Sequence, residues 1–402
     1  MVGSGGREHA LTWKIAQSEA LDELHAAPGN PGIAELASCH PIRADDVEGL
    51  LGLCRQYQLD LVVVGPEAPL VAGIADHLRA TGVTVFGPGA GAARIEGSKS
   101  FAKEVMHAAG VPTALELGEA RAPCVVKADG LAGGKGVFVC RTQEEADLAL
   151  EQALALGDAV VVEELLEGEE VSLFVLTDGV TALPLAPAQD FKRLRDDDEG
   201  PNTGGMGSYS PPPFLAPHEV DELVDLVHRP VLNELAARGA PFVGLLYAGL
   251  MLTEEGPRVL EFNCRFGDPE TQAILPRLTG DFLGALARAA EGALGGADLS
   301  TGPDAAVSVV LAAEGYPEAP QVGMPIRGVR EAEESGAIVF HAGTAMRDGE
   351  LVSAGGRALG VTGLGGSIAE ARDKAYAAIA LIDFRGAQYR RDVALRAVGV
   401  PG

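Results

Sequence analysis

Two lysines flank a glycine-rich stretch near the middle of the sequence. Residues 125–137 read VVKADGLAGGKGV, with Lys127 and Lys135 eight positions apart. Successive amides such as those of Gly133 and Gly134 can close over phosphate oxygens, and both ammonium groups can reach the same anion. A P-loop is excluded, because Lys135 is followed by glycine and not by the Ser or Thr that contacts Mg²⁺. The pattern fits a phosphate-binding hairpin or, alternatively, a surface hairpin with solvated lysines.

Oxygen donors alternate with apolar residues in a second stretch. Residues 259–271 read VLEFNCRFGDPET. Since alternate residues of a strand share a face, Glu261, Asn263 and Arg265 should point one way, and the residues between them, including Cys264, should point into the core. Carboxylate and amide oxygens suit Mg²⁺, which binds few protein oxygens together with phosphates and water. Arg265 can pair with a phosphate or a substrate carboxylate. We favour this interpretation over an exposed polar strand face.

The glycine turn at the start of the chain is a weaker phosphate signal. GSGGREH, residues 3–9, stands where a strand should meet a helix, and amides at a helix N-terminus favour an anion. The dinucleotide fingerprint would need glycine at position 8, where Glu8 stands, so an NAD site is not indicated. A tight structural turn explains the glycines nearly as well.

Three loops carry polar groups that suit a nucleotide or its partner substrate. Glu67 follows the carboxyl end of a predicted parallel strand and can take ribose hydroxyls, or it is a solvated loop acid. In residues 160–170 (VVVEELLEGEE), backbone groups near Glu164 and Leu166 can form hydrogen bonds with an adenine edge, and Glu170 can bind a ribose. Taken alone, the stretch indicates an exposed acidic turn. Residues 196–213 form either a closing loop or a plain linker.

Strands and helices alternate in the first part of the chain. A buried strand at 61–64, a helix near 71–80 and a strand at 83–86 have βαβ spacing, which implies a parallel sheet. Ser98 is placed to cap the next helix, which Gly110 should end.

The pattern changes after residue 113. Strands are expected at 124–127, 136–140, 159–165 and 170–177, around one helix that begins with a Thr142…Glu145 capping box. Pro217 should open a later helix, followed by strands around 244–252 and 258–263. The tail should contain a strand from about 305, a hairpin turn at Asp348-Gly349 and a helix after Ser367.

Composition bounds the class of protein. The chain has 402 residues, too many for one hydrophobic core, and a net charge of −26, which disfavours nucleic acid and anionic membranes as partners. Its five cysteines form no CxxC pair, which fits a reducing compartment. With neither a signal-peptide pattern nor a membrane-length apolar run, we expect a cytoplasmic protein.

Taken together, these stretches resemble the glycinamide ribonucleotide synthetase (phosphoribosylamine–glycine ligase) family of the ATP-grasp superfamily. The matching stretches include GSGGREHAL, APGNPG, VVGPEAPLVAG, EGSKSFAKE, VVKADGLAGGKGV, VVEELLEGEEVS, GPNTGGMGSYSP, VLEFNCRFGDPETQ, VFHAGT and GGRALGVT. The resemblance implies a multidomain α/β and α+β fold. Its parts are a Rossmann-like N-terminal domain (1–95), an ATP-grasp region (96–303) with a lid at about 113–178, and a β-rich C-terminal α+β domain (304–402).

The resemblance also implies roles for particular residues, with ATP lying between lid and core. Phosphates would be contacted by Lys99, Lys127, Lys135 and the amides of Gly133 and Gly134. The adenosine pocket would comprise Glu163, Glu164, Leu166 and Glu170. Glu261 and Asn263 would hold Mg²⁺ or Mn²⁺. The catalytic residues would be Arg265, Lys135 and Asp268. The substrate-binding residues would be Gly5, Gly6, Arg7, Glu67, Thr203, Gly204 and Gly205.

The reaction implied joins glycine to 5-phosphoribosylamine with ATP, in a chain expected to be a monomer without nucleic-acid or membrane partners. Three alternatives remain open: another ATP-grasp ligase or carboxylase with a different acid, a nicotinamide oxidoreductase, which Glu8 disfavours, and a non-catalytic nucleotide-binding regulator.

Overall fold

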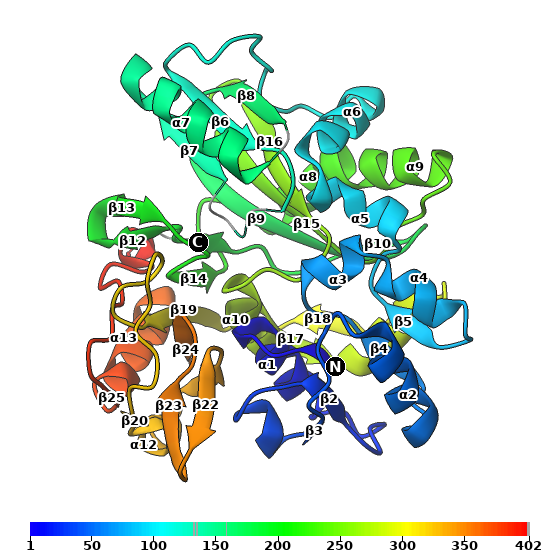
Figure 1. The fold of residues 1–402 in the computed structure, drawn as a ribbon, viewed down its shortest axis with the longest axis vertical. Coiled ribbons are helices and arrows are strands. Elements are labelled where there is room, and N and C mark those ends of the chain that lie inside the picture. The colour runs from blue at the N-terminus through cyan, green and yellow to red at the C-terminus, as the bar shows by residue number, and fades with distance from the viewer. Residues whose placement is uncertain (132, 134–135, 158, 400–402) are drawn as a thin grey trace.

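The computed structural model describes residues 1–131, 133, 136–157 and 159–399 (Figure 1). The N-terminal part is a parallel sheet with helices on its faces. Strands β1 (Val2–Gly3), β2 (His25–Pro28) and β3 (Ser38–Cys39) pair in that order, and β4 (Leu61–Val63) pairs with β5 (Thr84–Phe86). A parallel bridge between Val2 and Val64 joins the two groups. The predicted βαβ arrangement is confirmed.

Helices α1 (Gly6–Ile15) and α2 (Val47–Tyr57) belong to this part. The helix expected near 71–80 is two short helices, α3 (Glu67–Val71) and α4 (Ile74–Arg79). Gly73 separates them at φ 86°, a left-handed conformation that breaks a helix. The earlier start of α3 places Glu67 in a first helical turn rather than in a loop.

Helices α5 (Ala90–Gly97) and α6 (Lys99–Ala109) lead into the central part of the chain. As predicted, the Ser98 side chain accepts a hydrogen bond from the amide of Phe101, and Gly110 ends the helix at φ 69°. This cap fixes Lys99 as the first residue of α6.

A small sheet forms the part predicted to be the lid, drawn at the top of Figure 1. Strands β6 (Cys124–Ala128), β7 (Val137–Cys140) and β8 (Val160–Glu164) pair in the order β7-β6-β8. Helix α7 (Gln143–Leu156) begins with the predicted Thr142–Glu145 capping box and packs small residues against the sheet. The strand expected at 170–177 is wrongly grouped with these elements. It is β9 (Glu169–Asp178), whose nearly continuous burial is typical of a core strand, and it pairs with β15.

The core sheet beneath the lid is antiparallel. Its strands pair in the order β10 (Ala182–Pro184), β9, β15 (Val243–Thr253) and β16 (Gly256–Asn263). A helical stretch opens at Pro217, as predicted: α8 (Pro217–Leu223), the π-helical η3 (Val224–His228) and α9 (Arg229–Ala237). Apolar residues of this stretch share one cluster with β9 and β15.

A second large sheet joins the tail to the central part of the chain. Its order is β11 (Gln189–Asp190), β14 (Gly207–Ser210), β19 (Ala305–Ala312), β24 (Arg357–Gly365) and β21 (Ile338–His341). Helix α13 (Ile368–Ile379), which Ser367 caps, covers β24 and β19. The hairpin of β22 (Thr344–Arg347) and β23 (Glu350–Ser353) turns at Asp348-Gly349, both with positive φ. These elements confirm the predicted tail.

Shorter elements complete the described chain. The helices are η1 (Ile33–Glu35), η2 (Asp196–Asp198), α10 (Glu270–Ile274), η4 (Leu275–Arg277), α11 (Phe282–Ala290), α12 (Val329–Glu334) and η5 (Leu395–Ala397). The strands are β12 (Arg193–Arg195), β13 (Glu199–Asn202), β17 (Leu278–Gly280), β18 (Leu299–Thr301), β20 (Ile326–Arg327) and β25 (Asp383–Phe384). Within the described residues, every helix is too short or too polar to cross a membrane.

Candidate functional site

Two adjoining cavities lie between the lid, the core sheet and the C-terminal sheet. Their volumes are about 650 Å³ and about 270 Å³. Eight of the described residues line both: Lys127, Val137, Glu163, Asp190, Lys192, Thr203, Leu260 and Glu261. Because these residues face both spaces, the cavities form one continuous site with a polar junction.

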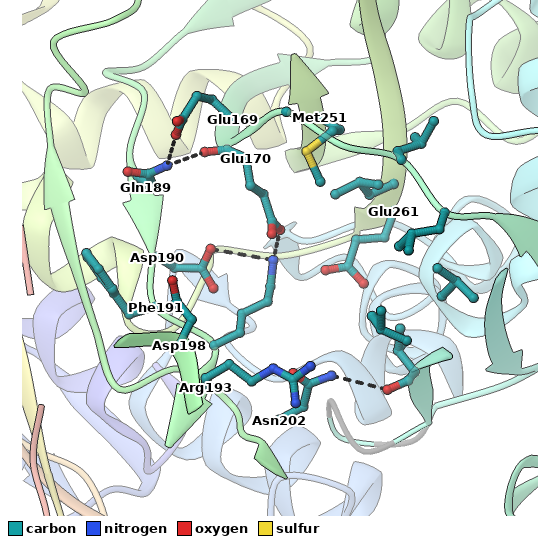
Figure 2. A pocket seen from close by; sticks show the side chains of 18 of the residues that line it. Glu169, Glu170, Gln189, Asp190, Phe191, Arg193, Asp198, Asn202, Met251 and Glu261 are labelled. Atoms are coloured by element: carbon teal, nitrogen blue, oxygen red, sulfur yellow. Dashed lines mark hydrogen bonds and ion pairs between the residues drawn. The ribbon is translucent and has the colours of Figure 1, made fainter. Parts of the chain in front are cut away.

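The larger cavity suits a nucleoside. Apolar side chains such as Val125, Leu166 and Met251 line it alongside polar groups from β8, β9 and β11. Figure 2 shows the carboxylates of Glu170, Asp190 and Glu261 pointing toward the same part of this space from three different strands.

Two residues predicted for the adenosine pocket have protein partners in this cavity. Glu164 accepts a hydrogen bond from the Leu115 amide at 2.8 Å, and Glu170 forms an ion pair with Lys192. Lys192 also lies 3.5 Å from Asp190. A ribose hydroxyl that approaches Glu170 must therefore share it with an ammonium group.

Glu163 stands between two lysines at the junction. Its oxygens lie 2.7 Å from Lys103 Nζ and 2.5 Å from Lys127 Nζ, and Lys127 also donates to the Leu260 carbonyl at 2.9 Å. Glu163 is 3% exposed, so this charge cluster is desolvated. Burial lowers the pKa of Lys103, and Glu163 opposes that effect. The Glu163 carboxylate thus holds the Lys127 ammonium group at the junction of the two cavities.

Lys99 links α6 to the lid turn. Its Nζ donates to the Gly130 carbonyl at 3.1 Å, and its backbone amide donates to Asp129 at 2.5 Å. Burial lowers the pKa of Lys99. The nearby negative charge of Glu261 is the largest influence in the opposite direction. Lys99 lines the smaller cavity together with Gly133, whereas Gly134 and Lys135 lie outside the described residues.

Glu261 and Asn263 end strand β16 with their side chains at the smaller cavity, and Glu261 reaches both cavities. Asn263 is 8% exposed. Within the described part of the chain, neither side chain has a hydrogen bond or ion pair with another protein group. Two free oxygen donors beside a phosphate-sized space fit a hard divalent cation that takes its other ligands from phosphates and water. No cluster of three or more His, Cys, Asp or Glu ligands occurs in the described residues.

Arg265 lies beyond the end of β16 rather than within it. It forms ion pairs with Glu67 at 3.2 Å and with Glu96 at 3.0 Å, and Cys264 beside it is buried, as predicted. Burial alone would raise the pKa of Glu67, but Arg265 and Arg7 lower it to about 2. The smaller cavity therefore has a wall of fixed, opposite charges.

The glycine turn before α1 already contains an anion, which is the carboxylate of Glu8. Glu8 accepts from the Gly5 amide at 2.6 Å and from Arg7 Nε at 2.7 Å. A side chain at Gly3 or Gly65 would collide with Glu8, which explains those glycines. Arg7 lines the smaller cavity, whereas Gly5 and Gly6 are not among the described residues that line it; a Cβ atom at either glycine would lie 3.7 or 3.8 Å from an Asp268 oxygen.

The loop after β13 closes the junction. Thr203 Oγ1 donates to the Lys192 carbonyl and accepts from the Gly205 amide, at 2.8 and 3.0 Å. Asn202 donates to the Val137 carbonyl of the lid at 3.2 Å. The end of β13 and the loop after it thus contact the lid strand and the site together, which fits the closing-loop interpretation better than a plain linker.

Comparison with known proteins identifies the family. The N domain of phosphoribosylglycinamide synthetase matches residues 1–96, its ATP-grasp (A) domain residues 97–271 and its C domain residues 306–396. The chain belongs to the phosphoribosylglycinamide synthetase family.

Individual relatives agree over the whole length. The phosphoribosylamine–glycine ligases of Mesorhizobium japonicum and Streptomyces coelicolor are 48% and 50% identical, each over 99% of this chain and 98% and 99% of theirs. The crystal structure of phosphoribosylamine–glycine ligase from Thermotoga maritima has a TM-score of 0.84 at 34% identity, covering 98% of this chain and 99% of that one.

A more distant neighbour shares only the fold. The biotin carboxylase domain of Hydrogenobacter thermophilus 2-oxoglutarate carboxylase, solved with MgADP and bicarbonate, has a TM-score of 0.70 at 18% identity and covers 96% of this chain and 90% of that one. The family fold expected from the sequence, with a Rossmann-like N-terminal part, an ATP-grasp core with its lid, and a C-terminal α+β part, is confirmed.

Several residues that line this site were not predicted from the sequence: Glu96, Lys103, Asp190, Lys192 and Arg357. One signal was available for Lys103, because it follows Lys99 by four positions on one helix and so shares its face. The others come from short strands or helix ends whose side chains meet the site only through long-range packing.

Proposed function

We propose that this chain is an ATP-dependent ligase that joins glycine to 5-phosphoribosylamine, giving glycinamide ribonucleotide, ADP and phosphate. The observation that carries the proposal is the junction of the two cavities. There, Lys127 and Glu261 face both the nucleoside-sized space and the space lined by Arg7, Arg265 and Asp268. A triphosphate that spans the junction would present its terminal phosphoryl group to an acid bound in the smaller cavity.

The chemistry follows from the weakness of a carboxylate as an electrophile. Attack of a glycine carboxylate oxygen on the γ-phosphorus of ATP would form glycyl phosphate and release ADP. The amine of phosphoribosylamine would then attack the acyl carbon, forming the C–N bond, expelling phosphate and losing a proton. Neither step needs an enzyme nucleophile, so the buried Cys264 has no part in it.

The protein's contribution would be positioning and charge neutralisation. Lys127 and Lys99 would contact phosphate oxygens, with Lys135 as a further predicted contact. Arg265 and Asp268 would lie near the reacting carboxylate, and Arg7 and Glu67 near the phosphoribosyl group. Adenosine would bind among Glu164, Leu166 and Glu170.

Glu261 and Asn263 would hold a divalent cation, for which we propose Mg²⁺ or Mn²⁺, since both are hard ions that accept oxygen ligands. When bound, such an ion neutralises charge on the phosphates during transfer. The two side chains need no rearrangement of protein partners to bind it, because the described chain provides none.

Release of phosphate with each substrate omitted in turn tests the proposal. We expect release only when ATP, glycine and phosphoribosylamine are all present, together with Mg²⁺ or Mn²⁺. Release that continues without glycine or without the amine would contradict it. Replacing glycine with bicarbonate separates the remaining candidate, a carboxylase of the same fold, which would then turn over.

We further propose that the enzyme acts in the cytoplasm. All five cysteines are free in the structure, and four of them are buried, as expected for a protein made in a reducing compartment. Fractionation of cells that produce the protein would test this.

A further inference from the structure

Two side chains of the C-terminal part, Tyr316 and Arg357, contact Gly204, which lines the smaller cavity. This cavity, where glycine and the amine would bind, is the acceptor end of the site. Arg357 is the first residue of β24 and lines the smaller cavity, and Tyr316 lies in the turn after β19. The sequence stretch GGRALGVT around Arg357 has no role in the function proposed so far.

Tyr316 and Arg357 hold Gly204 from two sides. The Gly204 amide donates to Tyr316 Oη at 3.0 Å, and the Gly204 carbonyl accepts from Arg357 Nη1 at 2.6 Å. A Cβ atom at Gly204 would lie 3.2 Å from Arg357 Cζ, so glycine allows the guanidinium to lie against the loop. Both polar backbone groups of this loop residue are thus fixed by the C-terminal part.

The same guanidinium holds Asp268. Arg357 Nη1 donates to the Asp268 carbonyl at 2.8 Å, and Nη2 pairs with its carboxylate at 3.2 Å. Burial would raise the pKa of Asp268, but Arg357, followed by Arg7, lowers it. The Asp268 carboxylate lies beside the turn before α1, 3.7 Å from the position of a Cβ at Gly5. Arg357 therefore joins the C-terminal part to two segments of the ATP-grasp region, one of which carries Asp268 beside the N-terminal turn.

The larger cavity is not in contact with these two side chains. Neither Tyr316 nor Arg357 is among the described residues that line it. Any effect of Arg357 should therefore fall on what binds in the smaller cavity rather than on adenosine.

We propose that Arg357, assisted by Tyr316, is a positioning residue that holds Gly204 and Asp268 at the acceptor end of the site. Through these contacts the C-terminal part sets how glycine and the amine are placed, whereas adenosine binds in the larger cavity, which neither Tyr316 nor Arg357 lines. The substrate names rest on the proposed function; the contacts do not.

Steady-state kinetics of Arg357→Ala and Arg357→Lys test the role. We expect the Ala variant to raise KM for glycine or the amine at least about tenfold and to lower kcat, because a small misplacement of reacting groups is enough to slow the reaction. KM for ATP should change less than about twofold, and the Lys variant should recover part of the loss. The matched control is Arg327→Ala, which removes an exposed arginine paired with Glu350 at 3.1 Å in the same part of the chain.

A double variant separates positioning from general loosening. If Arg357 acts through Asp268, then the double variant Arg357→Ala/Asp268→Asn should have a kcat/KM only slightly lower than that of Asp268→Asn alone. The proposal would be overturned if the Arg357 variants raised KM equally for all three substrates. It would also be overturned if the losses of kcat/KM from the two single substitutions multiplied fully in the double variant.

Amide hydrogen exchange of the substrate-free enzyme gives a readout independent of the reaction. In both Arg357 variants, exchange at Gly204–Gly207 should rise while exchange in α7 of the lid stays unchanged. Unchanged exchange in the loop would also overturn the proposal. If the wild-type enzyme fails the substrate-omission assay but the loop responds as expected, the function proposal falls and the positioning role stands.

Discussion

Most charged side chains that face the two cavities already have a protein partner. Arg265 is paired with two carboxylates, Lys127 with Glu163, and Asp268 with Arg357. Glu261 and Asn263 differ, because in the described chain their side chains have no such partner. A buried polar group without a partner is costly unless something else satisfies it. Asn263 is buried and Glu261 is half-buried beside the cavities, so these two side chains are the ones left available to a ligand.

Replacing Glu261 with Gln should remove the metal rather than unfold the protein. The amide keeps the shape but loses the charge, and we expect Mn²⁺ affinity in the presence of ADP to fall by more than about 100-fold, since even outer-shell partners of a metal are worth roughly 10- to 100-fold. Electron paramagnetic resonance of Mn²⁺ measures this directly. Glu255→Gln, at the exposed turn of the same hairpin, is the control. Unchanged Mn²⁺ affinity in Glu261→Gln would remove this residue from the metal site.

Glu163→Gln should instead destabilise the fold. The substitution leaves the ammonium groups of Lys103 and Lys127 buried without their shared counter-ion. Breaking a buried ion pair by removing one partner costs about 3–5 kcal/mol. Urea unfolding monitored by circular dichroism should show this loss, and Glu151→Gln on the exposed face of α7 should show almost none. A loss below about 1 kcal/mol would mean that the two lysines are not held by Glu163.

At the scale of elements, local signals predicted local structure well. The caps at Ser98 and Thr142 fix the starts of α6 and α7, because a side chain that accepts from an amide three residues later needs no tertiary context. The alternation in residues 259–263 likewise predicted a strand with its oxygen donors on the cavity side. These are patterns whose cause lies within a few residues.

Features set by distant partners were not predictable in this way. Nothing near β9 indicates that it pairs with β15 rather than with the lid strands. The contact between Arg357 and Gly204 joins positions 153 residues apart, and neither residue is unusual in its own surroundings. Glu8 illustrates a third kind of error: the glycines around it suggested a bound anion, and the anion is the protein's own side chain.

A pair of glycine substitutions tests how tightly the loop after β13 fits the site. Gly205 has φ 106°, and a Cβ there would lie 2.4 Å from Pro269 Cδ, so Gly205→Ala must displace the loop from the residues beside Asp268. We expect kcat/KM for glycine to fall at least about tenfold, because catalysis depends on placing groups within about 1 Å.

Gly52→Ala in α2 is the matched control. A Cβ at this position meets nothing within 4 Å, and alanine favours a helix by roughly 1 kcal/mol over glycine. The control should keep full activity and gain stability in thermal unfolding. Wild-type kinetics in Gly205→Ala would show that the loop does not have to lie against Pro269.

At the scale of the whole molecule, buried histidines join the first and last parts of the chain. His9 of α1 accepts a hydrogen bond at Nδ1 from the His341 amide at 2.8 Å and packs edge-on against Phe340. Asn30 donates to the His341 carbonyl at 2.8 Å. Because Nδ1 of His9 is an acceptor here, the ring must stay neutral for the contact to persist. The interface that brings the turn before α1 to the C-terminal sheet is therefore one that acid should weaken.

The direction and range of that pH dependence follow from the two histidines. Burial, with repulsion from His341, lowers the pKa of His9 from 6.5 to about 3, and burial lowers that of His341 from 6.5 to about 4. Between pH 6.5 and about 4 the unfolded chain binds these protons and the folded chain does not, so the free energy of unfolding falls as pH falls. The loss approaches about 1.4 kcal/mol per pH unit for each histidine, and above pH 6.5 they contribute no slope.

Urea unfolding across this pH range measures the slope for the wild type and for His9→Gln. Glutamine keeps an acceptor for the His341 amide but cannot take up a proton. The pH dependence of the free energy of unfolding should therefore be smaller in the variant by the contribution of about one proton, and the variant should remain folded at neutral pH. His218→Gln, which removes an exposed histidine, is the control. If His9→Gln and the wild type lose stability in parallel below pH 6.5, then the ring at this interface accepts a proton in the folded state as readily as in the unfolded chain, and the acid sensitivity must come from elsewhere.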